Sequence, residues 1–139
     1  MKHGIKASVS GIRGVLGESL TPPVVLGYVN AYADWLGKGT VALGRDTRAH
    51  GPAVQGFVES VLMACGINVI DLGVVPTPTL LHFVRENGLE GGVVVTASHN
   101  PIEWNALKLV KKGGLFLDQQ DFEEMSRRFS DEAPAGLYK

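Results

Sequence analysis

The chain has 139 residues, and its 13 Lys and Arg side chains against 14 Asp and Glu give a formal net charge of −1. This length is typical of one domain, and the balanced charge argues against nucleic acid or an anionic membrane as a partner. Hydrophobic residues make up 45% of the chain, as in folded globular proteins, and 18 glycines indicate tight turns or backbone held close to a ligand.

The single cysteine, Cys65, cannot form an internal disulfide and lies in an apolar stretch. We therefore expect a buried, inert thiol and a reducing compartment. No apolar run approaches the length that spans a bilayer, and the first residues lack the apolar core of a signal peptide. The sequence predicts a cytoplasmic protein.

Helical and strand patterns alternate along the chain. Thr21 and Pro22 are typical of a helix start, and Gly37 of a helix end. Thr77 is the expected cap of a third helix that ends at Gly88, and Asp118 that of a fourth. The expected helices cover 22–36, 52–65, 78–87 and a segment after 118, and the expected strands cover 40–44, 67–72, 92–96 and 105–110, with a short extended segment at 115–117.

This alternation predicts an α/β fold, a three-layer α/β/α sandwich around a mixed, largely parallel sheet of about four strands. Residues 92–96 form a continuous apolar run, which is typical of a strand covered on both faces. Residues 1–129 are the expected domain, and the polar residues 130–139 are the expected linker or tail.

Ligands of such sheets bind beyond the carboxyl ends of the strands. Two polar loops follow strands there, Gly-Arg-Asp-Thr-Arg at 44–48 and Thr-Ala-Ser-His-Asn-Pro at 96–101. Glycine-rich nucleotide motifs are not present: residues 37–40 precede a strand rather than a helix, and residues 11–14 lie in no strand–turn–helix unit.

Ser98 lies at the mouth of the buried strand, where its hydroxyl could attack a phosphoryl or acyl centre. The neighbouring His99 suggests a dyad, but side chains of consecutive residues diverge and no Gly-x-Ser-x-Gly elbow is present, which disfavours a serine hydrolase. The alternative is that Ser98 and Asn100 only satisfy turn backbone.

Four cations are candidate phosphate ligands, each with a plain alternative. Lys108 either faces solvent or points at the Ser98 loop as a cation and proton-transfer group. Arg13, between two glycines, either binds phosphate or is an ordinary surface arginine. Arg45 and Arg48 flank Asp46, and either contact substrate or form a local ion pair. The histidines show no ligand spacing, so a structural zinc site is not expected.

The loop at 96–101 resembles the phosphoserine loop of the α-D-phosphohexomutases, the phosphoglucomutase and phosphomannomutase superfamily. Segments 10–14, 44–48, 76–78 and 105–108 also resemble motifs of that family, in the same order. The similarity runs from about residue 8 to 129. Two positions depart from the usual pattern: Val9 stands where many members have threonine, and Ala106 where many have glycine.

The resemblance implies that Ser98 carries a phosphoryl group, gives it to a hexose phosphate, and takes the other phosphate back from the reoriented bisphosphate. It implies catalytic roles for Ser98, Lys108, Arg13 and His99. Substrate phosphate is expected to bind Ser10, Arg13, Asn100, Lys108 and Arg45, and Mg²⁺ to bind a phosphate oxygen on Ser98.

The family has four domains, and this sequence resembles only the first. The resemblance therefore implies that the remaining metal ligands and sugar-binding loops belong to later domains of the same polypeptide, and that this chain alone is inactive. The expected partners are phosphorylated hexoses, hexose bisphosphate and those domains. The alternative is a non-catalytic domain of the same fold that binds phosphosugar or phosphate or serves in assembly.

Overall fold

Strands and helices alternate through most of the chain, and the computed structural model describes residues 4–130. The strands are β1 Lys6–Ser8, β2 Gly11–Val15, β3 Thr40–Arg45, β4 Asn68–Val74, β5 Gly91–Val95, β6 Trp104–Lys111 and β7 Leu115–Phe116. The helices are α1 Pro22–Leu36, α2 Gly51–Ala64, α3 Thr77–Glu86 and α4 Gln119–Ser126. No helix among residues 4–130 is long and apolar enough to cross a membrane.

The sheet is mixed and has seven strands, in the order β1-β2-β6-β5-β3-β4, with β7 paired to β6. The expectation of about four, largely parallel strands is therefore wrong, because only β5–β3 and β3–β4 pair in parallel. A parallel neighbour requires a crossover of about a dozen residues or more, usually a helix. Residues 96–103 are too few for one, so β6 returns antiparallel to β5.

The sequence patterns do not reveal β1 and β2. Their hairpin is short, β1 is exposed, and β2 contains two glycines, which are depleted in strands. Gly11 has φ +121°, and a Cβ on it would lie 2.8 Å from the Leu107 carbonyl oxygen of β6. Glycine is thus required where the hairpin lies against the sheet.

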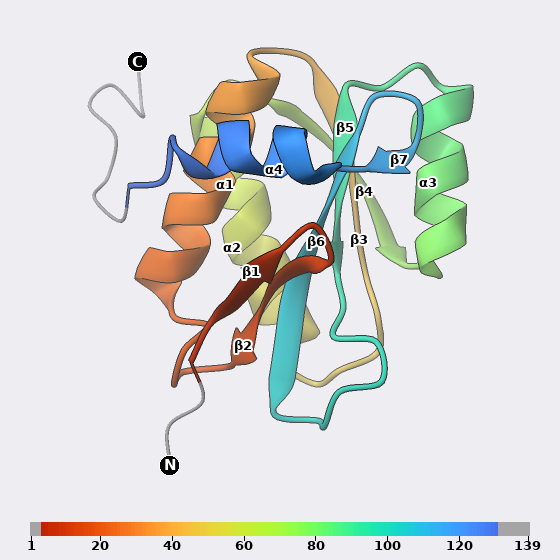
Figure 1. The fold of residues 1–139 in the computed structure, drawn as a ribbon. Coiled ribbons are helices and arrows are strands. Elements are labelled where there is room, and N and C mark those ends of the chain that lie inside the picture. The colour runs from red at the N-terminus through yellow and green to blue at the C-terminus, as the bar shows by residue number, and fades with distance from the viewer. Residues whose placement is uncertain (1–3, 131–139) are drawn as a thin grey trace.

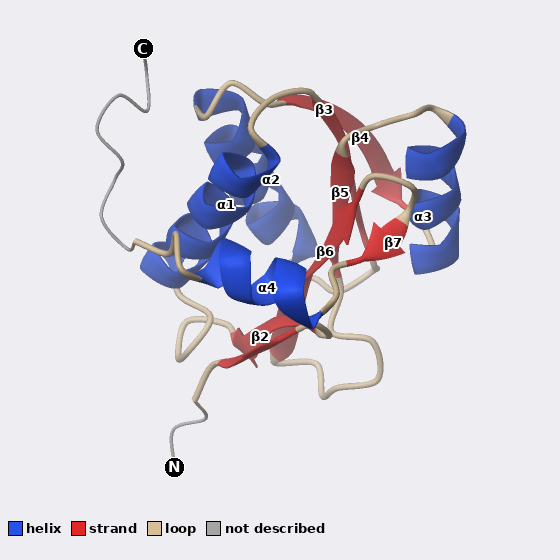
Figure 2. Ribbon diagram, turned by 45° about the horizontal axis from the view of Figure 1, so that its top comes forward, coloured by secondary structure: helices blue, strands red, loops and turns tan. Residues whose placement is uncertain are grey.

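Figures 1 and 2 show α1, α2 and α4 on one side of the sheet and α3 on the other, which confirms the three-layer α/β/α sandwich. The larger buried cluster lies beneath α1 and α2 and includes Val93 and Val95 of β5. The smaller cluster lies beneath α3 and includes Val94. All five residues of β5 are buried, as its continuous apolar run predicted.

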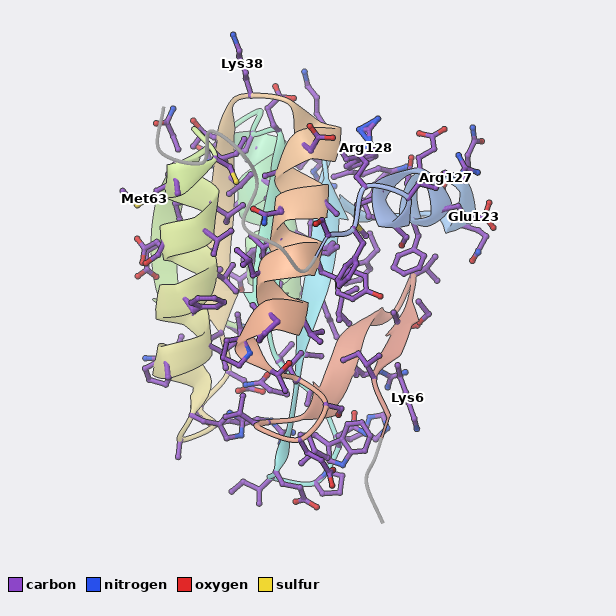
Figure 3. The ribbon with its side chains drawn as sticks, turned by 90° about the vertical axis from the view of Figure 1, so that its left-hand side faces the viewer. Lys6, Lys38, Met63, Glu123, Arg127 and Arg128 are labelled. Carbon is purple, nitrogen blue, oxygen red and sulfur yellow. The ribbon has the colours of Figure 1, made fainter. Side chains whose placement is uncertain are left out.

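The helix ends follow the local sequence closely. Gly37 takes φ +87° after α1, and Asp118 caps α4 through a capping box with Asp121. The expected cap of α3 is wrong by one position, because Thr77 is already helical and Pro76 precedes it. Figure 3 shows Glu123 of α4, and Arg127 just after this helix, extending away from α1.

The predicted linker or tail begins where the description of the chain ends. Of residues 130–139, only Ser130 is described, and residues 131–139 lie outside the described part.

Candidate functional site

Two loops meet at one end of the sheet. Since β3 and β5 are adjacent and parallel, the loop after β3 (residues 46–50, the arginine loop) lies beside the loop after β5 (residues 96–103, the serine loop). The Asp46 backbone N–H donates to the Val95 carbonyl at 3.1 Å. The sheet topology therefore brings together the two loops at which the sequence predicted ligand binding.

Ser98 has an exposed side chain on a constrained backbone. Its φ is +55°, the only positive φ of a non-glycine residue among residues 4–130. Its backbone N–H donates to Thr96 Oγ1 at 3.1 Å, and that hydroxyl donates to Asp46 Oδ2 at 2.7 Å. Left-handed backbone at a non-glycine residue costs about 1–3 kcal/mol and persists where surrounding contacts hold it. The loop thus presents the Ser98 hydroxyl to solvent in a fixed orientation.

Arg48 holds the serine loop together. Its Nε pairs with Asp46 Oδ2 at 3.3 Å, and its side chain is 11% exposed. Its two other nitrogens donate to four carbonyl oxygens, those of Pro101 at 2.7 Å, Asn100 at 2.8 Å, Ser98 at 3.0 Å and Trp104 at 3.1 Å. A guanidinium has five N–H donors, and all five are used. Arg48 therefore forms the local ion pair and has no donor left for a substrate.

Arg13 and Lys108 lie on one face of the sheet, as the register shows. Arg13 is directly opposite Ala106, and Lys108 is two residues further along the same strand. Lys108 is also opposite Val94, which packs beneath α3. Because directly paired residues share a face and alternate residues of a strand do too, both cations lie on the α3 side of the sheet.

That face leads directly to the serine loop. Thr96 continues β5 and its backbone N–H donates to the Ala106 carbonyl. Arg13, Ala106 and Thr96 therefore form one row across three strands, and Asp46 binds the last of them. Figure 1 shows α3 toward the opposite end of the sheet from the serine loop, so α3 does not cover this row.

Both cations are half-buried at this position. Among the residues that the structure describes, the Nε of Arg13 is buried and has no hydrogen-bond partner. Gly11 lies against Lys108, and a Cβ on Gly11 would be in ordinary contact with the Lys108 Cγ, at 3.5 Å. Lys6, opposite Arg13, lies over the Trp104 ring at 5.3 Å and is labelled in Figure 3. Arg13, Lys108 and Lys6 therefore place positive charge at the edge of the site.

The remaining expected ligands differ in how they are placed. His99 is exposed, and its Nδ1 lies 3.5 Å from Ser98 Oγ, too long for a strong dyad. Asn100, within the loop, has a buried Oδ1 that accepts no hydrogen bond from any described residue. Arg45 donates to the Asp46 carbonyl at 3.2 Å. Ser10 is exposed in the β1–β2 turn, where its N–H donates to Ser8 Oγ, and that turn adjoins the Lys108 end of β6 rather than Ser98.

Several residues have supporting roles that the sequence analysis did not assign to them. Asp46, Thr96 and Arg48 stood in the nominated loops, and only their contacts reveal that they fix the Ser98 backbone. Ala106, one of the two departures, is fully buried between Arg13 and Thr96 in the row. Its methyl therefore fits where the expected pattern has glycine.

In the described range, neither a metal-binding cluster nor a strongly nucleophilic thiol is found. Among residues 4–130, no group of three or more His, Cys, Asp or Glu side chains gathers to hold a metal ion. Cys65 is half-buried rather than buried, and its Sγ lies 3.3 Å from Asn30 Oδ1. Burial, with a smaller contribution from Asp34, raises the pKa of the thiol, so Cys65 is a weak nucleophile.

The fold and both loops have counterparts in known proteins. Residues 4–135 match the family described as phosphoglucomutase/phosphomannomutase, alpha/beta/alpha domain I. A protein of Methanopyrus kandleri, assigned as a probable phosphoglucosamine mutase, is 47% identical over 118 residues, which cover 85% of this chain and 26% of that protein. A phosphoglucosamine/phosphogalactosamine mutase of Sulfurisphaera tokodaii is 39% identical over 88% of this chain and 27% of its own length.

Solved structures agree with these sequence matches. A Thermus thermophilus protein assigned as a phosphomannomutase aligns with a TM-score of 0.87 at 30% identity, over 96% of this chain and 32% of that one. A phosphoglucomutase/phosphomannomutase family protein of Burkholderia thailandensis aligns with a TM-score of 0.70 at 31% identity, over 89% of this chain and 31% of that one.

The fold is a three-layer α/β/α domain, and a serine loop lies at the carboxyl end of its central strand β5. These two features together define the class of protein. The chain belongs to the phosphoglucomutase/phosphomannomutase family and corresponds to its α/β/α domain I. It spans about a quarter of the length of the curated relatives it matches.

Proposed function

We propose that this chain is the serine-bearing domain of a cytoplasmic phosphohexomutase that interconverts hexose 1-phosphates and 6-phosphates. Family membership supports this proposal, and so do relatives assigned as phosphoglucosamine mutases and phosphomannomutases. The single observation that carries it is the Ser98 hydroxyl, exposed on a φ +55° backbone that Thr96 and Arg48 hold in place.

Ser98 Oγ is the proposed phosphoryl carrier. In the first step the bond between Oγ and phosphorus breaks as the oxygen of a sugar hydroxyl bonds to phosphorus, and a base takes the hydroxyl proton. The bisphosphorylated sugar then reorients. In the second step its other phosphate returns to Ser98 Oγ, and the proton goes back to the sugar oxygen. Such transfers require charge neutralisation and in-line positioning more than covalent protein chemistry.

Lys108 and Arg13 are the proposed groups for these tasks. A half-buried lysine can act as a base when neutral and as an acid when charged, so Lys108 is the candidate for proton transfer. Arg13, whose buried Nε has no partner in the described structure, is the candidate for binding phosphate. His99 and Asn100 flank Ser98 as further phosphate contacts, with Arg45 and Ser10 at the margins.

Mg²⁺ is the expected metal of the reaction, but residues 4–130 do not form a complete site for it. A phosphate on Ser98 would supply one hard oxygen ligand, and the Asp46 carboxylate is already engaged by Thr96 and Arg48. The other ligands are therefore expected from parts of the polypeptide beyond those described.

The experiment uses the full-length protein and hexose 1,6-bisphosphate labelled in its phosphates. After incubation, peptide mass spectrometry should find one phosphoryl group on Ser98, and Ser98→Ala should abolish both the label and mutase activity. Ser60→Ala is the matched control, because Ser60 is an exposed serine of α2 that binds only the Gly56 carbonyl.

The result also separates catalysis from binding alone. A protein that binds the bisphosphate without labelling Ser98 would be a phosphosugar-binding module of the same fold. Label on a different residue would contradict the proposed carrier.

A further inference from the structure

His50 is the first residue before α2, yet its ring does not cap the helix. Ser, Thr, Asp and Asn are preferred at that position because their side chains accept from the exposed helical N–H groups. The His50 ring instead contacts the far side of the serine loop. Its Nε2 lies 3.0 Å from the Ile102 carbonyl oxygen, and its Nδ1 lies 3.1 Å from Asn105 Nδ2.

The surrounding hydrogen bonds determine which ring nitrogen carries the proton. Asn105 is fully buried, and its Oδ1 accepts from the Ala106 backbone N–H at 2.9 Å. The amide nitrogen of Asn105 must therefore face His50, and an amide nitrogen only donates. Nδ1 of His50 accepts that bond, which leaves the proton on Nε2 to be donated to the Ile102 carbonyl.

A charged ring would not fit this arrangement. It would place an Nδ1–H against the amide hydrogens of Asn105, and a positive charge at the N-terminus of α2, where the helix dipole disfavours it. The contacts of His50 are thus satisfied by the neutral Nε2–H tautomer.

His50 and Arg48 hold the serine loop from the same side. Arg48 binds the carbonyls of residues 98, 100, 101 and 104, and His50 binds that of Ile102 and the side chain of Asn105. Arg48 fixes the Ser98 turn directly. His50 fixes the returning half of the loop, where it enters β6.

We propose that His50, as the neutral Nε2–H tautomer, is a positioning residue that sets the orientation of Ser98 for phosphoryl transfer. This inference rests on the proposed function. His50 acts through Ile102 and Asn105 and touches no reacting atom, so its loss should lower kcat and leave KM for the hexose phosphate nearly unchanged.

The test compares three variants of the full-length protein. His50→Ala removes both bonds, and we expect kcat to fall roughly tenfold, as the loss of one to two hydrogen bonds implies. His50→Asn places an oxygen near the Nδ1 position, and His50→Gln places an N–H donor near the Nε2 position. Each should restore part of the lost kcat. His82→Ala, at an exposed histidine of α3, is the control and should match the wild type.

Nitrogen-15 NMR of the histidine rings supplies a readout that does not depend on activity. The expected spectrum of His50 has a protonated Nε2 and an unprotonated Nδ1. A proton on Nδ1, or a His50→Ala protein with wild-type kcat, would overturn the proposal. If the His50→Ala protein does not fold, His50→Gln and His50→Asn test the proposal in its place. A kcat in these variants as low as that expected for His50→Ala would contradict a positioning role for His50. A changed KM would contradict it as well.

The two proposals fail in different ways. If wild-type protein carries no label on Ser98, the proposed function fails while the ring spectrum can still agree. If Ser98 is labelled and the ring spectrum or the kcat of the His50 variants disagrees, only the role of His50 is wrong.

Discussion

At the scale of single residues, the backbone of the serine loop is held by hydrogen bonds from several side chains. Arg48 provides the largest part, since one guanidinium binds four loop carbonyls and the Asp46 carboxylate. Ser98 keeps its left-handed backbone only while these bonds hold. On the proposed function, the Ser98 hydroxyl is thereby oriented before any substrate arrives, which lowers the cost of reaching the transition state.

Arg48→Lys tests this account of the loop. A lysine has three donors on one nitrogen and cannot span the four carbonyls, so we expect labelling of Ser98 to slow by roughly 10- to 100-fold. The rate is measured by quenched incubation with labelled bisphosphate. Arg85→Lys is the control, because Arg85 is exposed and pairs only at the surface. Equal rates for Arg48→Lys and wild type would refute the role of Arg48.

Lys108→Arg separates proton transfer from charge alone. Arginine keeps the positive charge but does not give up its proton, so we expect kcat to fall by roughly 10²- to 10⁴-fold if Lys108 moves the proton. Lys112→Arg, at an exposed lysine of the β6–β7 turn, serves as the comparison and should be unaffected. Full activity of Lys108→Arg would mean that Lys108 contributes its positive charge and does not transfer the proton.

At the scale of elements, a helix and two strands are tied together by one buried hydroxyl. Tyr32 of α1 is fully buried, and its hydroxyl lies 2.6 Å from the Val110 carbonyl of β6. The same oxygen accepts from the Gly92 backbone N–H of β5 at 2.9 Å. A Cβ on Gly91 would clash with that hydroxyl, so this glycine in β5 makes room for it. Burial raises the pKa of the Tyr32 hydroxyl, which keeps it protonated and able to donate.

Tyr32→Phe should therefore destabilise the domain. Without the hydroxyl, the buried Gly92 N–H loses its partner, and we expect the free energy of unfolding to fall by about 1–3 kcal/mol. Urea unfolding followed by circular dichroism measures it. Tyr28→Phe is the comparison, since the half-buried Tyr28 ring packs on Phe129 outside the strand interface, and it should cost less. An unchanged midpoint for Tyr32→Phe would contradict the role of the hydroxyl.

At the scale of the whole molecule, the proposed function makes this chain one side of a larger site. The relatives it matches are about three times as long, and it aligns with about a quarter of each. The row formed by Arg13, Ala106 and Thr96 lies at the same end of the sheet as the serine loop. Among residues 4–130, no three His, Cys, Asp or Glu side chains gather to hold a metal ion. The remaining ligands and the sugar-binding contacts are thus expected from outside this domain.

The 139-residue chain expressed alone should accordingly fail to interconvert glucose 1-phosphate and glucose 6-phosphate. A coupled dehydrogenase assay measures the product, and the full-length protein under the same conditions provides the positive control. Circular dichroism confirms that the isolated chain is folded before it is assayed. Turnover by the folded chain alone would contradict the proposal that other domains complete the site.

The sequence by itself determined the helices, the three layers and the position of Ser98. Helix ends at Gly37 and Asp118 and the apolar run of β5 are local signals, set by backbone preference and side-chain periodicity. The number and direction of the strands were not set by such local signals. β2 is stabilised by pairing with β6, and β1 by pairing with β2, rather than by their own residues, which include glycines at 11 and 14.

Only the tertiary structure decided how the loop residues work. The sequence placed Arg48 beside Asp46, but residues about fifty positions away along the chain supply its carbonyl partners. His50 has no distinguishing spacing, and its role depends on an asparagine amide that is oriented by the next backbone N–H. Glycines and polar loops mark where a ligand site lies, because these signals are local. The assignment of each donor to its acceptor depends on chain segments that meet only when β3, β5 and β6 form one sheet.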